Sequence, residues 1–135
     1  MIVEDLCQYK VVYTASPYSL YPAGRVAAFR DICTVSAKLI KSGVSVYAPI
    51  VMTHPIAIHG DLMGFHNDPD SFDWIKFDEA MMNVSDALLV AKMLTWETSV
   101  GIKYEINFFR KANKPIFLIN PHNMEISKAT DELAS

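Results

Sequence analysis

Short apolar runs alternate with segments of helical spacing along this chain of 135 residues, and this alternation limits the folds open to it. The apolar runs, each of strand length, lie at residues 10–15, 44–50, 87–91 and 115–120. Segments with apolar residues at helical spacing lie between them, at 26–43, 71–85 and 99–112. Strands that alternate with helices predict βαβ units and a parallel sheet covered by helices on both faces.

The helical spacing also predicts which side chains face the core. The expected stripes are Val26, Phe29, Cys33, Ala37 and Ile40 in the first helix, Trp74, Phe77, Met81 and Val84 in the second, and Ile102, Ile106 and Phe109 in the third. Gly43 stands where a C-terminal helix cap is expected. The tail is weakly patterned, and we expect a short helix over 126–133.

Composition indicates one globular domain over residues 1–135, without repeats or a linker. Hydrophobic residues make up 51% and charged residues 20%, and the net charge is −3. This balance gives no reason to expect a nucleic acid polymer or a membrane as a partner. Cys7 and Cys33 are far apart, and the N-terminus lacks the pattern of a signal peptide. We therefore expect reduced thiols and a cytoplasmic protein.

Residues 51–70 are predicted to form a long irregular loop, because they hold three of the four histidines with two prolines and two glycines. Ordered loops of this length are usually functional. In a parallel sheet the loops after the strands meet at one edge. The loops that begin at Ser16, Val51 and Lys92 are therefore expected to converge on a pocket.

The segment from Trp96 to Glu105 has the composition of an anion site followed by a reactive group. Ser99 and Gly101 stand at the expected mouth of a helix, where free backbone amides attract anions. Glu105 follows one turn later on the face of Gly101. A carboxylate there is suited to attack a sugar carbon. The alternative, a solvated glutamate near a helix N-terminus, stays open.

Asp78 is the second candidate acid. It lies between Trp74 and Met81 in a predicted helix, where partial burial would raise its pKa and allow it to donate a proton to a leaving group. The alternative is that Asp78 and Glu79 belong to the solvated face of the helix.

The turn after the first strand offers groups that suit a phosphate. Ser16 and Ser19 bring hydroxyls, and Arg25 brings a guanidinium fork. The turn is neither a glycine-rich dinucleotide motif nor a P-loop, and a plain strand-end turn remains the alternative. His54, His59 and Asp61 have poor spacing for zinc, so we expect no metal and interpret His54 as a polar wall of the pocket.

Together these positions resemble the nucleoside 2-deoxyribosyltransferase superfamily, which includes deoxynucleoside monophosphate N-glycosidases. The resemblance is closest to a bacterial and phage branch, the domain of unknown function 1937, and extends from about Val11 to Pro121. The positions that carry it are 13–19 with Arg25, 48–50, 53–57, Asp78 eight residues before Asp86, Trp96, Ser99, Gly101 and Glu105.

The resemblance implies a flavodoxin-like three-layer sandwich with five parallel strands, of which the sequence places four. It implies that Glu105 attacks C1′ of the deoxyribose, that Asp78 assists departure of the base and that Tyr13 positions the nucleophile and the sugar. By the same resemblance Ser99 binds a 5′-phosphate, and a neighbouring subunit completes the site in a homodimer or larger assembly.

We therefore expect cleavage or transfer of the N-glycosidic bond of a 2′-deoxynucleoside or its 5′-monophosphate, without a cofactor. Trp74 and Trp96 would supply apolar walls or an aromatic face for the base. The chain departs from the transferases, which commonly carry an acidic residue and a Gly-Thr pair where Trp96-Glu97-Thr98-Ser99 stands here. A nucleotide-binding module without catalysis is the alternative function, and a flavin-binding electron carrier is a third.

Overall fold

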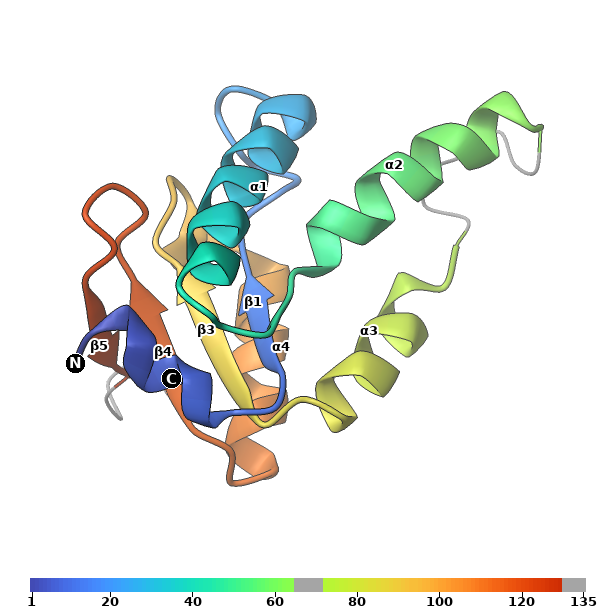
Figure 1. Cartoon of the computed structure of the whole chain (residues 1–135). Coiled ribbons are helices and arrows are strands. Elements are labelled where there is room, and N and C mark those ends of the chain that lie inside the picture. Colours follow the sequence, from blue (N-terminus) through green and yellow to red (C-terminus); the bar gives the residue numbers. More distant parts are fainter. Residues whose placement is uncertain (65–71, 130–135) are drawn as a thin grey trace.

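The computed structural model describes residues 1–64 and 72–129, and its centre is a five-stranded sheet (Figure 1). The strand order is β2-β1-β3-β4-β5; β1 to β4 are parallel and β5 is antiparallel to β4. The strands are β1 (Val12–Ala15), β2 (Val46–Tyr47), β3 (Ala87–Ala91), β4 (Ile116–Ile119) and β5 (Ile126–Lys128). The four predicted strands are confirmed. β2 is shorter than predicted, because Pro49 already starts a helix.

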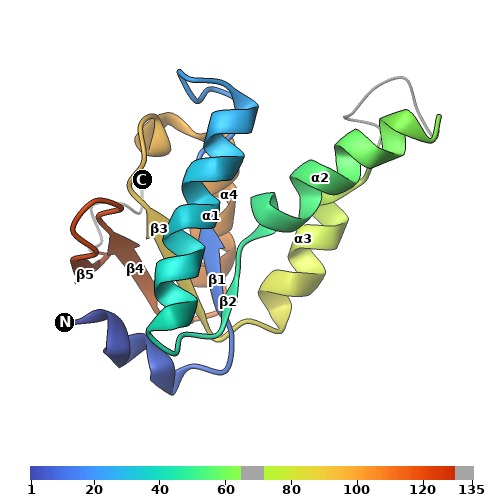
Figure 2. The ribbon, with the colours of Figure 1, turned by 45° about the horizontal axis from the view of Figure 1, so that its top comes forward.

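Helices cover both faces of the sheet, which makes the fold the expected flavodoxin-like three-layer α/β sandwich (Figure 2). The helices are η1 (Val3–Gln8), α1 (Arg25–Lys41), α2 (Pro49–Leu62), α3 (Trp74–Asn83), η3 (Trp96–Thr98) and α4 (Val100–Lys111). Side chains alternate along β3, so Leu89 packs beneath α1 while Leu88 and Val90 pack beneath α4. Within the described residues, no helix is long and apolar enough to cross a membrane.

The prediction of a long irregular loop over 51–70 is wrong for most of its length. Residues 49–62 form α2, and residues 65–70 lie outside the described residues. Pro49 occupies the first turn, where its missing N–H costs no hydrogen bond. Pro55 lies inside the helix. Proline usually interrupts a helix, which is why the sequence predicted a loop here. Figure 1 shows α2 leading away from the sheet rather than lying flat on it.

The helix predicted over 126–133 is also wrong where the structure describes it. Residues 126–128 form β5, and Ile126 pairs with Ile119 of β4 and is buried against the sheet. Hydrogen bonds to an open sheet edge are a tertiary interaction, and helical spacing in so short a segment does not report it. Residues 130–133 lie outside the described part of the chain.

In α1 the predicted stripe is displaced by about one position from the side chains that face the sheet. The fully buried residues include Ile32 and Leu39, whereas Val26 and Ile40 of the predicted stripe are exposed. The helix has a second apolar face toward α2, where Phe29 stacks on His54 with ring centroids 4.6 Å apart. The predicted stripe combined residues from both faces of α1. Gly43 follows the helix with φ +92° and caps it as predicted.

The inward face of α4 is confirmed, since Ile102, Ile106 and Phe109 are all buried. The stripe predicted for α3 is partly wrong. Met82 is its fully buried side chain, and Val84 lies beyond the helix and is 63% exposed. The helix begins after Asp73, whose carboxylate accepts a hydrogen bond from the Lys76 amide, and ends before the turn that leads into β3. Ser71, the predicted first residue, lies outside the described residues.

Candidate functional site

Tyr13 is the residue of β1 around which the candidate site is built. Its side chain is fully buried between Tyr47 and Phe109, with ring centroids 5.7 and 5.8 Å away. Burial raises the pKa of the Tyr13 hydroxyl far above its usual range, and the nearby carboxylates of Glu105 and Asp78 raise it further. The hydroxyl has no hydrogen bond of normal geometry to a described residue. It is therefore a protonated donor close to two acids, and its interaction with Glu105 affects the pKa values of both groups.

Glu105 is buried on the inward face of α4. A glutamate side chain in water would carry a charge at neutral pH, so its burial here is unusual. Burial raises its pKa to about 8; the hydroxyl of Tyr13 opposes this shift, and the charge of Asp78 adds to it. A solvated glutamate on the outer face of the helix would show none of these features. The burial of Glu105 excludes that alternative.

Asp78 comes from α3, on the other side of the same space. It is half-buried, and burial raises its pKa to about 6. Its Oδ1 atom is enclosed without a hydrogen-bond partner among the described residues. The charge of Asp78 raises the pKa values of Glu105, Tyr13 and Tyr47, which shows that the four side chains share one environment.

We call Tyr13, Tyr47, Asp78 and Glu105 the acid cluster. Tyr47 is its one member that the sequence analysis missed. It is the last residue of β2 and lies beside Tyr13 of the neighbouring strand β1. Burial, followed by the charge of Asp78, raises its pKa to about 12. No local motif marks Tyr47. It stands in the middle of the predicted strand 44–50, and only the shorter observed β2 places it at a carboxyl end, where parallel sheets bind their ligands.

A hollow of about 330 Å³ lies at the N-terminus of α4, and we call it the α4 hollow. Ser99 caps the helix, and its Oγ accepts a hydrogen bond from the Ile102 amide at 3.2 Å. Ser16, from the turn after β1, is buried, and its Oγ has no partner within the described residues. Gly101 leaves this helix mouth free of a side chain. Free amides, the helix dipole and an unpaired hydroxyl together suit an anion.

Arg25 and His54 do not line the α4 hollow but lie behind Tyr18, which does. The Tyr18 hydroxyl and His54 Nδ1 share a hydrogen bond of 2.5 Å, and the Arg25 guanidinium lies 5.3 Å from the centroid of the Tyr18 ring. Burial lowers the pKa of His54, and the charge of Arg25 lowers it further. His54 is therefore neutral at neutral pH and connects α2 to the turn after β1.

The two tryptophans are separated in the structure. Trp96 is half-buried and packs against the core on the α4 side of the sheet. Trp74 begins α3 and contacts Phe72 and Phe77, at ring-centroid distances of 4.6 and 6.2 Å. Neither of them lines the α4 hollow. In the described ranges 1–64 and 72–129, no group of three or more histidine, cysteine or acidic side chains is placed to hold a metal ion.

The comparison with protein families gives a match over most of the chain. The model of a family described as Domain of unknown function (DUF1937) matches residues 10–121. A search of curated proteins found no match. The matched range contains β1 to β4, the acid cluster and the α4 hollow. Because it covers most of the chain, the protein belongs to the DUF1937 family.

Proposed function

We propose that this protein cleaves the N-glycosidic bond of a 2′-deoxynucleoside or its 5′-monophosphate. The observation that carries the proposal is the acid cluster, in which three chain segments bring a buried Glu105 and a half-buried Asp78 into electrostatic contact beside Tyr13. Buried acids are costly to keep, and such groups gather at functional sites. The resemblance of these positions to the nucleoside 2-deoxyribosyltransferase superfamily supplies the reaction class.

The number of protons in the cluster fits the proposed chemistry. The pKa values of Asp78 and Glu105 are raised to about 6 and about 8, so the pair holds one proton near neutral pH. The reaction requires that proton on Asp78 and a charged Glu105. Positive charge that develops on the sugar carbon, together with a hydrogen bond from Tyr13, would favour this arrangement.

In the first step the Glu105 carboxylate attacks C1′ from the face opposite the base. The bond from C1′ to the base nitrogen breaks, its electron pair stays on the base, and Asp78 gives the base its proton. A deoxyribosyl ester of Glu105 remains. Asp78, now a carboxylate, takes a proton from a water molecule that attacks C1′; the ester bond to Glu105 breaks, and deoxyribose or its 5-phosphate leaves with net retention. Alternatively, a second base attacks C1′ and completes a transfer.

The α4 hollow is the proposed site of a 5′-phosphate or of the 5′ end of the sugar. Gly101 and Glu105 are one helical turn apart, which is about 6 Å along the axis. An anion held by the amides near Ser99, with the Ser16 hydroxyl as a further donor, would place the sugar over Glu105. This hollow supports a nucleotide as substrate in preference to an unphosphorylated sugar.

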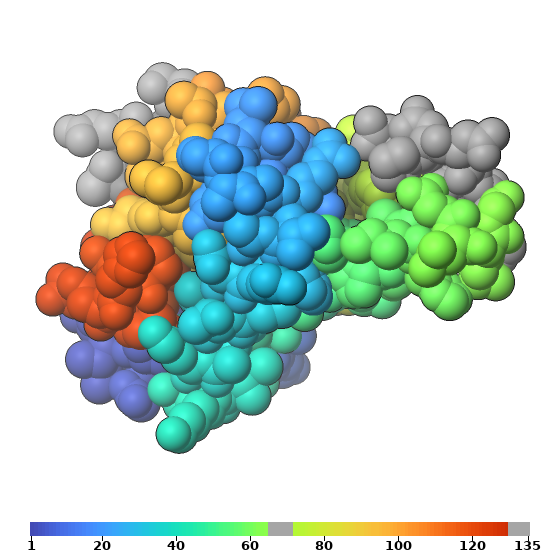
Figure 3. Space-filling view, turned by 90° about the horizontal axis from the view of Figure 1, so that it is seen from above, coloured from blue at the N-terminus to red at the C-terminus, as the bar shows by residue number. Residues whose placement is uncertain are grey.

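We further propose that the working unit is a homodimer assembled through α2. Helix α2 is apolar on most sides, and Figure 3 shows it leading away from the body of the molecule. Ile58 and Leu62 are 48% and 80% exposed. An apolar helix that a monomer leaves in water commonly marks an interface.

Chromatographic detection of free base tests the activity. Wild-type protein is incubated with a library of nucleosides and nucleoside monophosphates, alongside Glu105→Gln and the matched control Glu97→Gln. Glu97 is exposed in η3, near the same helix mouth. We expect base release from wild type and the control, and loss of at least about 1,000-fold in Glu105→Gln. Mass spectrometry of the quenched reaction should detect a deoxyribosyl adduct on the peptide that carries Glu105.

A nucleotide-binding module without catalysis is the second candidate. The raised pKa of Glu105, about 8, favours it, because an uncharged carboxyl is not a nucleophile. This function predicts saturable binding of nucleotides and no base release by wild type. Equal rates of base release by wild type and Glu105→Gln would instead reject Glu105 as the nucleophile.

A further inference from the structure

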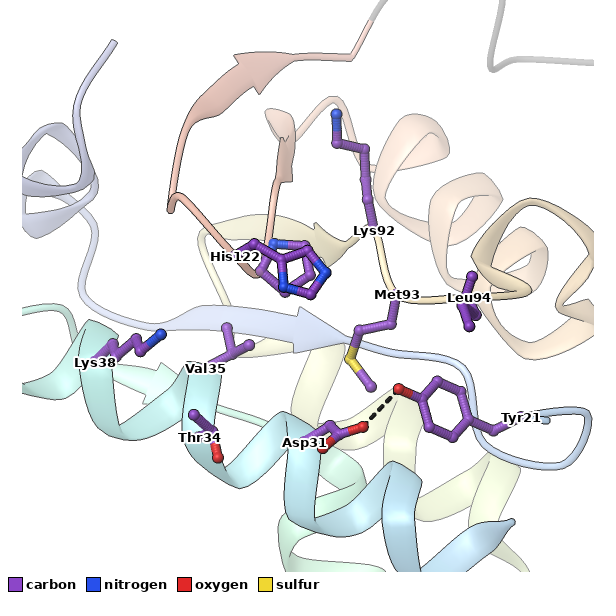
Figure 4. A pocket seen from close by; sticks show the side chains of 10 residues that line it. Tyr21, Asp31, Thr34, Val35, Lys38, Lys92, Met93, Leu94 and His122 are labelled. Atoms are coloured by element: carbon purple, nitrogen blue, oxygen red, sulfur yellow. Dashed lines mark hydrogen bonds between the residues drawn. The ribbon is translucent and has the colours of Figure 1, made fainter. Parts of the chain in front are cut away.

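A second hollow, of about 410 Å³, lies on the α1 side of the sheet beyond the carboxyl ends of β3 and β4, and we call it the α1 hollow (Figure 4). Its walls come from α1, from the segment after β3 and from the turn between β4 and β5. Its volume is within the usual range of small-molecule sites. Neither the acid cluster nor the α4 hollow contributes a residue to it.

Three cationic or hydrogen-donating side chains from different elements line the α1 hollow: Lys38, Lys92 and His122. In Figure 4, His122 faces the middle of the hollow and Lys38 approaches from α1, whereas the Lys92 side chain extends away from both. The one acid in the lining, Asp31, already accepts a hydrogen bond of 2.6 Å from the Tyr21 hydroxyl. Neither lysine forms an ion pair with a described residue. The hollow therefore carries net positive charge in a protein whose net charge is negative.

The turn that presents His122 is held in one conformation before any ligand arrives. The Asn120 side chain accepts hydrogen bonds from the backbone amides of His122 and Asn123, at 2.9 and 3.3 Å. The Asn120 amide donates to the Glu125 carbonyl, and the Met124 amide donates to the Asn120 carbonyl. A ligand that binds His122 would not have to order this turn, and preorganisation of this kind favours affinity.

Apolar side chains form the rest of the lining. Val35 and Met93 are buried, and Pro121 is half-buried beside them. A site with basic groups on one side and apolar groups on the other suits an organic molecule with one strongly anionic end. We propose that the α1 hollow binds a small phosphate monoester, with the phosphate held by Lys38 and His122 and the organic part against Val35, Met93 and Pro121.

This site is distinct from the proposed nucleotide site. The segment between β3 and α4 separates the two: Lys92, Met93 and Leu94 line the α1 hollow, whereas Thr95 and Ser99 line the α4 hollow. Thr95 has a left-handed backbone, with φ +74°, at the point where the segment turns from one hollow to the other. Binding at the α1 hollow does not depend on the proposed activity.

Chemical-shift mapping on the ¹⁵N-labelled full chain tests the proposal, with inorganic phosphate and glycerol phosphate as the probes. We expect saturable shifts at the amides of Thr34, Met93 and His122. Shifts at Ser16, Ser99 and Gly101 would report the α4 hollow separately. In the double variant Lys38→Gln/His122→Gln the dissociation constant from the shifts of Thr34 and Met93 should rise by about tenfold or more. It should not change in Lys41→Gln, an exposed lysine of α1 outside the hollow.

Absence of shifts at Thr34, Met93 and His122 up to about 10 mM probe, a concentration that would fill even a millimolar site, would overturn the proposal. Equal dissociation constants in wild type and the double variant would overturn it as well. Because the readout is the position of the shifts and not base release, failure here is distinguishable from failure of the proposed glycosidase.

Discussion

At the scale of single residues, the candidate site depends on where one proton resides. Burial raises the pKa values of Glu105 and Asp78 to about 8 and about 6, and the charge of Asp78 contributes to the shift of Glu105. The singly protonated pair is most populated between these two values, and only this form combines an acid with a nucleophile.

Base release should therefore follow a bell-shaped pH profile. We expect kcat/KM to fall below about pH 6, where both carboxyls hold a proton, and above about pH 8, where neither does. In Asp78→Asn the rate should be much lower, and the profile should keep only a rising limb, because Glu105 then titrates alone. The midpoint of that limb should lie below 8, since the charge of Asp78 no longer raises the pKa of Glu105. A flat wild-type profile from pH 5 to 9 would contradict the assignment.

The burial of Glu105 also predicts that its charged form lowers the free energy of unfolding. A carboxyl whose pKa is higher in the folded protein than in the unfolded chain makes its full contribution to stability below its ordinary pKa, and loses that contribution as the pH rises through the folded value. For Glu105 this interval runs from 4.5 to about 8. Glu105→Gln removes the titration, so its free energy of unfolding should equal that of wild type near pH 4 and exceed it by about 5 kcal/mol at pH 9.

Urea unfolding at both pH values measures this difference, and Glu97→Gln is the matched control. Glu97 is exposed, so its substitution should leave the pH dependence of stability unchanged. A Glu105→Gln variant that is less stable than wild type at pH 9 would show that the carboxylate stabilises the fold, which an acid retained for function does not do.

At the scale of elements, the sequence predicted what local pattern determines. The apolar runs at β1, β3 and β4 and the spacing of Ile102, Ile106 and Phe109 were sufficient to place strands and a helix. Helix α2 and strand β5 were missed for opposite reasons. Proline and glycine indicated a loop where a helix forms, and helical spacing concealed a strand that exists only because β4 offers an open edge.

The candidate site shows the same division between local and tertiary information. Ser99, Gly101 and Glu105 lie within one helix, so their spacing alone indicated a common face. Asp78 had to be weighed against a solvated position, because its burial depends on how α3 packs against α4. Tyr47 reaches the site through strand pairing with β1, which no local pattern reports.

One further side chain at this scale positions α3 and so Asp78. Lys114 follows α4, and its ammonium group donates hydrogen bonds to the carbonyls of Met82, Asn83 and Ser85 at 3.2, 2.9 and 2.6 Å. The carbonyls of Met82 and Asn83 end α3, where a positive charge also stabilises the helix dipole, and that of Ser85 lies in the turn that follows. Lys114 therefore ties the end of the helix that carries Asp78 to the rest of the fold.

Lys114→Met should lower the free energy of unfolding by about 2 kcal/mol, because it removes three hydrogen bonds from a charged donor while keeping the apolar stem. Urea denaturation measures this loss. Lys111→Met is the control, since Lys111 is exposed at the end of α4. We expect the control to stay within about 0.5 kcal/mol of wild type. Equal stability of the two variants would show that the hydrogen bonds of Lys114 do not hold the end of α3.

At the scale of the whole molecule, the main feature without an intramolecular explanation is α2. Its N-terminal part contacts α1 and β1, and its C-terminal part leads away from them (Figures 1 and 3). Ile58, Leu62 and the following Met63 are 48%, 80% and 53% exposed. Burial of such side chains is worth about 1.5–3 kcal/mol each, which a second copy of the chain would recover through a symmetric contact.

Sedimentation equilibrium should therefore give twice the monomer mass for wild type, and a charge placed on this helix should shift the protein toward the monomer. In Ile58→Glu/Leu62→Glu we expect the dimer dissociation constant to rise by at least about 100-fold, because two charges would have to enter an apolar interface. The control is Ile2→Glu, the same substitution at a 63% exposed residue beside η1. A monomeric wild type would leave α2 as a solvated apolar helix, and an unchanged dimer in the double variant would assign the contact to another surface. If the double variant is monomeric, folded and without base release, the second subunit contributes to the site as well as to stability.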